Sequence, residues 1–303
     1  MKNMSKDFKL QSAMEYLMTY GWAILIIAVV LGALFSLGIF NPAFLAPKVQ
    51  PGSCQVERPY GPGTSAYVSI QGNCNNELPE FVSDFNSYNS YITMPESSSF
   101  NPPDLSVSFW IYPKTEGGND GSSSTFIISN ANPNFAGGIW NWAFEFWPNG
   151  LDFHSCDYSY SCSGAGNMYL PLNQWSFVTG TYNGIWNLYL NGQYFDSGSG
   201  SIEGTPPANI TFGTSHCTPG NGCYQGYFNG FLANVQVYNT TLSPAAIQYL
   251  YREGIGGEPT SLNNLVAWWP LNGNTKDYSG NDNSGVNSNM IYTNGWTSGY
   301  TAT

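Results

Sequence analysis

Basic side chains are scarce in this sequence. Eight Lys and Arg residues stand against 19 Asp and Glu residues, which gives a formal net charge of −11 at pH 7. A nucleic-acid-binding protein needs positive charge to neutralise phosphates. The composition therefore excludes nucleic acid as a partner. Charged residues make up only 9% of the chain, which is not the Lys/Glu-rich surface of a helical cytosolic protein.

Charge is absent altogether from one long stretch. Residues 16–47 carry no charged side chain, and residues 22–40 are almost continuously apolar. About 20 such residues span a bilayer as a helix, whereas a secretory signal is shorter and ends at a small-residue cleavage site. Because Lys2, Lys6 and Lys9 precede the stretch, we expect a single-pass membrane helix with a cytoplasmic N-terminus and an extracellular C-terminal part.

The segment 9–16 reads KLQSAMEY and resembles an archaeal class III (prepilin-type) signal sequence. This resemblance implies cleavage between Leu10 and Gln11, with the helix kept on the mature protein. It also implies that Glu15 pairs with the N-terminal amine of a neighbouring subunit in a filament, because a carboxylate in apolar surroundings needs a charged partner. Leu10 departs from the family, which usually has a small residue there. An uncut membrane anchor is the alternative.

All six cysteines follow the apolar stretch, and an even number in an extracellular segment indicates disulfides. Many pairings are formally possible. The most economical set joins neighbours in the sequence, namely Cys54–Cys74, Cys156–Cys162 and Cys217–Cys223. The short C-x₂₋₄-C pairs of a zinc site are absent, so disulfides are preferred over metal.

From about residue 80 apolar and polar residues alternate, which is typical of half-buried strands. Shared apolar faces are predicted within residues 105–111, 140–146, 175–179, 186–190 and 231–237. Asn149-Gly150 and Asn191-Gly192 are strong hairpin signals. Many short strands predict an antiparallel β-sandwich.

One helix is predicted late in the chain. Ser243 is a good N-cap, and Pro244 suits the first helical position. An apolar stripe follows over residues 247–251, and Gly254 comes after the helix end.

Several stretches, in order, resemble the laminin-G-like jelly roll, a concanavalin-A-like sandwich. They are FNSYNSYI at 85–92, LSVSFWI at 105–111, QWSFVTGTY with LYLNG across 174–192, and FNGFLANVQVY with the following LS across 228–243. The resemblance covers most of 80–252. It implies a mainly β, lectin-like fold, in which calcium binding is common.

Residues 265–273 (LVAWWPLNG) and 277–283 resemble the motif that this family usually has at its N-terminus, although here both lie near the C-terminus. Sandwich termini often lie close together. We therefore expect this segment to fold back and supply the missing first strand, as in a circular permutation. Insertion into a neighbouring subunit and the stub of a second repeat are the alternatives.

Related sandwich glycosidases carry clustered carboxylates about 5–9 Å apart, but their E-x-D-x-x-E strand pattern is absent. Glu145 and Asp152 fall on adjacent strands around a predicted turn, where they are most simply solvent-facing residues. His154 and His216 are not spaced as a metal pair, and no recognisable nucleophile accompanies them. We therefore expect no enzyme activity.

Aromatic residues around the first small cysteine loop are candidates for sugar binding, because exposed rings stack on sugars and binding residues gather on loops. Trp147, Tyr158 and Tyr160 are the ligand candidates. Trp140 and Trp142 continue an alternating apolar face, so we expect them in the core.

Oxygen-bearing side chains are densest at residues 277–283. Asp277, Asn281, Asp282 and Asn283 are the candidate ligands for calcium, the one cofactor expected. An Asx-rich turn that bonds to its own backbone is the alternative. Two sequons make Asn209 and Asn239 candidates for glycosylation.

These observations predict five segments: a leader at 1–10, a transmembrane or pilin-like helix at 11–40, a disulfide-stapled linker at 41–79, a jelly roll at 80–255 and a completing segment or stub at 256–303. The expected function is adhesion or glycan recognition by a membrane-anchored or pilin-like surface protein. Its expected partners are the membrane, carbohydrate and like subunits. A structural filament subunit without a specific ligand and a tethered glycan-degrading enzyme are the alternatives.

Overall fold

A computed structural model describes residues 18–31, 54–57, 69–72, 81–86, 88–117, 124–131, 140–157, 159, 161–202, 208–215, 226–293 and 301–302. The chain forms two compact units, Met1–Pro51 and Gly52–Thr303. In the first unit residues 18–31 are helical and their side chains are exposed. Within the described residues no helix is both long and apolar enough to cross a membrane. Leu10, Gln11 and Glu15 lie outside the described residues.

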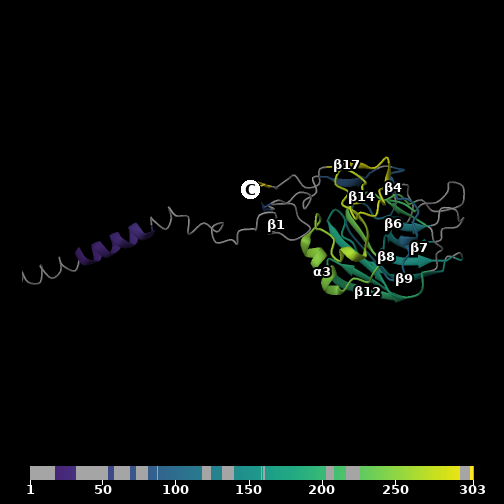
Figure 1. Cartoon of the computed structure of the whole chain (residues 1–303), viewed down its shortest axis with the longest axis horizontal. Helices are drawn as coiled ribbons and strands as arrows, with labels where there is room; N and C mark the ends of the chain where they lie inside the picture. Colours follow the sequence, from purple (N-terminus) through teal and green to yellow (C-terminus); the bar gives the residue numbers. More distant parts are fainter. Residues whose placement is uncertain are drawn as a thin grey trace, which may run out of the picture. The chain divides into compact units, whose positions relative to one another are not determined.

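The second unit is built from two large antiparallel sheets (Figure 1). One contains β3 (Val82–Phe85), β5 (Leu105–Pro113), β10 (Ser176–Tyr182), β11 (Ile185–Leu190), β12 (Gln193–Ser199), β14 (Gly230–Tyr238), β15 (Leu265–Trp269) and β17 (Ile291–Thr293). Its order is β12–β11–β10–β5–β14–β3–β17, with β15 paired to β14 off this path.

The other sheet contains β4 (Tyr91–Thr93), β6 (Thr125–Ala131), β7 (Trp140–Trp147), β8 (Gly150–Cys156), β9 (Cys162–Met168), β13 (Asn209–Phe212) and β16 (Val286–Ser288). Its order is β16–β4–β13–β6–β7–β8–β9. A third, small sheet joins β1 (Cys54–Glu57), β2 (Ser69–Gly72) and β18 (Thr301–Ala302), in which β18 runs parallel to β2. The predicted mainly β, antiparallel sandwich is confirmed.

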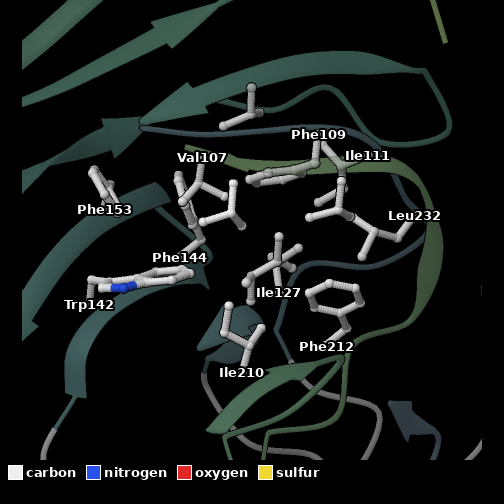
Figure 2. Packing of buried hydrophobic residues seen from close by; sticks show 14 of the residues in the cluster. Val107, Phe109, Ile111, Ile127, Trp142, Phe144, Phe153, Ile210, Phe212 and Leu232 are labelled. Atoms are coloured by element: carbon white, nitrogen blue, oxygen red, sulfur yellow. The ribbon is translucent and has the colours of Figure 1, made fainter. Parts of the chain in front are cut away.

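The main core fills the space between the two large sheets (Figure 2). Alternate residues of β5, including Val107 and Phe109, point toward Trp142 and Phe144 of β7. The rings of Phe109 and Phe144 meet edge to face, with centroids 4.8 Å apart. This burial explains the period-two pattern of the sequence, because each strand turns one face to the partner sheet.

A second cluster covers the opposite face of the eight-stranded sheet. Trp110 of β5 and Phe177 of β10 pack there with Ile247 and Leu250 of α3 (Pro244–Glu253). The predicted helix is confirmed: the Ser243 hydroxyl accepts the Ala246 N–H as its N-cap. A 3₁₀ turn, η1 (Ser98–Phe100), precedes β5, and another, η2 (Leu262–Asn264), precedes β15.

The C-terminal strands pair with strands of the same chain. In register, Val235 of β14 pairs with Trp269 of β15, while β16 pairs with β4 and β17 with β3. Figure 1 shows these strands, in yellow, among the earliest strands of the sandwich, in blue. The Trp269 side chain is fully buried, and its Nε1 donates to the Asn283 carbonyl over 2.9 Å. The segment therefore contributes to both sheets and to the core.

Two predicted apolar faces are wrong in part, and a β-bulge is the reason in each case. In β14 the register shifts between Ala233 and Gln236, so Ala233 packs under α3 while Val235 enters the main core. In β7 the register of the pairing with β8 shifts between Trp140 and Ala143. Trp140 therefore does not belong to the main core cluster, although Trp142 does. An extra residue in one strand reverses the face of every residue beyond it.

The two sheets meet at the edge formed by β9 and β12. A Cβ atom added to Gly198 of β12 would clash with the carbonyl oxygen of Gly164 in β9. Only a residue without a side chain fits such a backbone approach. The glycines of these strands thus close one side of the sandwich and leave little side-chain bulk beside β8.

Candidate functional site

The outer face of β7, β8 and β9 carries a group of ionisable side chains. Phe144 and Phe153 point into the core, so the alternating neighbours Glu145, Asp152 and His154 lie on the opposite face. Glu145 and Asp152 are directly opposite each other in the β7–β8 register. The hairpin at Asn149-Gly150 therefore makes the two acids neighbours.

Glu145 is not the solvent-facing residue that the sequence suggests, because only 7% of it is exposed. The Ser124 hydroxyl donates to its Oε1 over 2.7 Å, and the Trp147 side chain also bonds to the carboxylate. Burial raises the pKa of Glu145 to about 7, and the nearby charge of Asp152 adds to that rise.

His154 lies next to Glu145, with its Nε2 atom 3.5 Å from Glu145 Oε2. Burial lowers the pKa of His154 to about 4, so the imidazole is neutral at physiological pH. Within the described residues neither His154 Nε2 nor Trp140 Nε1 has a hydrogen-bond partner. Trp140 stacks on Phe126 and meets His154 edge-on, with ring centroids 5.0 Å and 6.4 Å apart.

A pocket of about 200 Å³ opens beside these residues. Its lining residues are Asp152, His154, Cys162, Gly164, Ala165, Gly166 and Asn167. The Asn167 N–H donates to Asp152 Oδ1 over 2.6 Å, and the Gly166 N–H donates to Asp196 Oδ2 over 3.0 Å. Carboxylates from β8 and β12 thus accept two consecutive N–H groups of β9. Burial raises the pKa of Asp152, and the charge of Asp196 raises it further.

The Cys156–Cys162 disulfide joins the ends of β8 and β9 beside the pocket. Its two sulfurs and a ring nitrogen of His154 lie within 4.8 Å of one another. Both sulfurs are bonded to each other, so they are not thiolate ligands for a metal. Cys74, Cys217 and Cys223 lie outside the described residues, and of Cys54 only the backbone is described.

The aromatic ligand candidates are only partly described. Trp147 is half-buried at the end of β7, where its bond to Glu145 places it near the pocket residues. Tyr158 and Tyr160 lie outside the described residues. Ser159, which lies between them, and Ser161, which follows Tyr160, donate their backbone N–H groups to Asp157 Oδ1 over 2.8 Å and 2.9 Å.

The candidate calcium ligands are held by local hydrogen bonds. Asp277 Oδ1 accepts the Trp268 and Ser279 N–H groups, and its Oδ2 accepts the Asn283 N–H. The Asn281 and Asn283 side chains donate to carbonyls of β15. This is the Asx-type arrangement; Asp282 is exposed and has a left-handed backbone, with φ of 59°. Calcium binding stays a prediction.

The two sequon asparagines differ in accessibility. Asn239 is exposed just after β14, whereas Asn209 is half-buried in β13 with its Oδ1 atom enclosed. Glycosylation stays a prediction at both, and Asn239 is the better placed for it.

Comparison with protein families matches residues 86–248, more than half of the chain, to the concanavalin A-like lectin/glucanases superfamily. A comparison with curated protein sequences gives no match.

Solved structures resemble the sandwich at low sequence identity. A candidate carbohydrate-binding protein from Bacteroides ovatus has a TM-score of 0.51 and 12% identity, with 75% of this chain and 62% of that chain covered. The chain thus spans less than two thirds of that protein's length. A heptameric SAP-like pentraxin from Limulus polyphemus has a TM-score of 0.50 and 14% identity, with 72% and 96% covered. These likenesses concern the fold alone, whereas the family match covers most of the sandwich. The chain belongs to the concanavalin A-like lectin/glucanases superfamily.

Proposed function

We propose that this chain is a carbohydrate-binding surface protein, and that a sugar binds in the pocket beside β8 and β9. The observation that carries the proposal is the pocket itself, which Asp152, Asn167 and the buried His154 help to line. The Asp152 carboxylate accepts hydrogen bonds, and the hydroxyl groups of a sugar donate them. The lectins of the superfamily and the description of the Bacteroides protein support the same class of ligand.

The pocket suits one small polar ring. Its volume of about 200 Å³ lies below the range of roughly 300–1,000 Å³ that is usual for drug-sized ligands. Asp152 offers a carboxylate to sugar hydroxyl groups, and Trp147 supplies an aromatic surface nearby. The pocket is small and has a few polar groups that point to one place, so it favours recognition of a single terminal sugar.

A glycan array screened with the Gly52–Thr303 unit tests this function. We expect binding to at least one glycan, and a loss of at least tenfold in affinity on changing Asp152→Ala. The matched control Asp104→Ala removes an exposed carboxylate outside the pocket and should bind as the wild type does. An array on which no glycan binds, or on which both variants lose binding equally, contradicts the proposal.

Binding without catalysis is the form of the proposal that the geometry favours. Glu145 has the raised pKa of a general acid, but its side chain is only 10% exposed and does not line the pocket. A substrate oxygen could not reach it without rearrangement. Release of reducing sugar from the glycans that bind would instead favour the glycan-degrading alternative.

The apolar sequence of residues 22–40 supports display of the binding unit at a membrane or on a filament. The residue found at the N-terminus of the native protein separates the two. A start at Gln11 favours a processed, pilin-like subunit, and a start at Met1 favours an uncut anchor.

A further inference from the structure

The Cys156–Cys162 disulfide joins two neighbouring strands of the seven-stranded sheet. Cys156 is the last residue of β8 and Cys162 is the first residue of β9, and the two are directly opposite each other in the antiparallel register. β9 is the edge strand of this sheet, so it has a hydrogen-bonded neighbour on one side only. The bridge therefore ties the edge strand to β8 at the end where the chain turns from one strand to the next.

The two sulfur-bearing residues differ in access. Cys156 is buried, with 1% of it exposed, whereas Cys162 is exposed and lines the pocket. Thiol–disulfide exchange begins with the attack of a thiolate on one of the two sulfurs, and access helps to decide which sulfur is attacked. The pocket therefore favours attack on the sulfur of Cys162, and Cys156 is the leaving group.

The half of β9 next to the bridge is held by little side-chain packing. Cys162 is exposed, the next two residues are half-buried, and the first buried side chain is the single methyl group of Ala165. Toward β12, Gly164 makes a close backbone approach to Gly198 without a side chain on either strand. Glycine in a strand interior weakens the strand. Apart from the ladder with β8 and this backbone approach, the bridge is what holds the first half of β9 in place.

We propose that the Cys156–Cys162 bridge is a thiol–disulfide exchange site that controls this wall of the pocket. A thiolate attacks Cys162 Sγ, the bond between the two sulfurs breaks, and Cys156 leaves as a thiolate that takes a proton from water. A second thiol then attacks the external sulfur of the mixed disulfide and releases Cys162. The bridge gains two electrons and two protons, and two molecules of the external thiol become one disulfide.

Opening of the bridge acts on the pocket through β9. Residues 164–166 line the pocket and directly follow the half of the strand that the bridge holds. Without the bridge, local opening of this edge segment needs only the ladder hydrogen bonds to break, because few apolar contacts oppose it. The wall of the pocket then loses its fixed position. This inference does not depend on which ligand the pocket binds.

Two single variants test which cysteine is accessible. Cys156→Ser leaves the thiol of Cys162, and Cys162→Ser leaves the thiol of Cys156, so each variant is the control for the other. The folded full chain of each is treated with iodoacetamide, and the modified residue is identified by peptide mass spectrometry. We expect Cys162 to react at least tenfold faster, because reaction requires an accessible thiolate. Equal rates, or a faster reaction at Cys156, overturn the inference.

The wild-type chain tests whether the bridge exchanges while the sandwich stays folded. The full chain is incubated without denaturant in an excess of 2-mercaptoethanol, a neutral thiol that the Asp152 carboxylate does not repel. Acid stops the exchange, because it removes the thiolate, and peptide mass spectrometry then locates the mixed disulfide. We expect it at Cys162. A mixed disulfide at Cys156, or a bridge that opens only in urea, contradicts the proposal.

Hydrogen exchange tests the effect on the pocket wall. The variant in which both Cys156 and Cys162 are replaced by Ser is a permanently open form with the other cysteines unchanged. At short exchange times we expect its amides at residues 162–166 to exchange at least tenfold faster than those of the wild type, whereas β10, a central strand, is unchanged. Equal acceleration in both segments shows a general loss of stability and overturns control of the wall, as does no acceleration at residues 162–166.

Discussion

The neighbouring Glu145 and His154 lead to an unusual prediction about stability and pH. Between pH 4.5 and 6.5 the unfolded pair carries one proton, on the imidazole, because the ordinary pKa values are 4.5 and 6.5. The folded pair also carries one proton, because burial raises the pKa of Glu145 to about 7 and lowers that of His154 to about 4. Because the folded and unfolded pairs bind the same number of protons, the pair does not make the free energy of unfolding depend on pH in this range.

Substituting either residue alone should make the free energy of unfolding depend on pH, with opposite signs for the two variants. With Glu145→Gln, only unfolded His154 binds a proton between pH 6.5 and about 4, so the free energy of unfolding falls as pH falls. With His154→Gln, only folded Glu145 binds a proton between pH 7 and 4.5, so the free energy of unfolding falls as pH rises. Each slope is about 1.4 kcal/mol per pH unit, or roughly 3 kcal/mol over the full interval.

Urea denaturation of the Gly52–Thr303 unit at half-unit steps from pH 4.5 to 7 measures these slopes relative to the wild type. Glu96→Gln, at an exposed position, is the matched control and should follow the wild-type curve. Parallel curves for all three variants, or slopes of the same sign for Glu145→Gln and His154→Gln, would refute the assignment of one shared proton to the buried pair.

Two further variants test the core and the loop. Trp269→Ala should lower the free energy of unfolding by about 3–5 kcal/mol, because it removes a fully buried ring. Leu262→Ala, 69% exposed in the same segment, should change it by less than about 0.5 kcal/mol; similar effects in urea denaturation would contradict core membership of β15. Replacing Cys156 and Cys162 by Ser should cost roughly 2 kcal/mol, because the disulfide closes a short loop. An unchanged melting temperature would argue against that contribution.

Much of the fold follows from local patterns in the sequence. Alternation locates β5, β7, β10, β11 and β14, and the cap at Ser243 locates α3. The positions that local pattern misplaces lie beyond bulges. Trp140 and Val235 read as members of uninterrupted faces, but the pairing with a neighbouring strand shifts register between them and the rest. Such a shift depends on the partner strand, which a single alternating stretch does not contain.

Only the part of the candidate site that lies within one hairpin was predictable from the sequence. The Asn149-Gly150 turn is enough to make Glu145 and Asp152 neighbours. The hydrogen bond of Glu145 comes from Ser124, which lies outside the hairpin, and the approach of Asp196 depends on the closure of two sheets at β9 and β12. The run of glycines in β9 is the one local sign of a pocket, since alternate residues there lack side chains.

The late position of β15 to β17 also sets the timing of folding. Ser90, beside β4, donates a hydrogen bond to the carbonyl of Asn289, 199 residues further along the chain. At about 5–20 residues per second, the ribosome needs about 10–40 s between these two points. During that interval β3 and β4 lack their pairing strands β17 and β16, and the core lacks the Trp269 ring. Exposed strand edges invite association with other chains, so a nascent sandwich of this topology depends on protection until its last strands arrive.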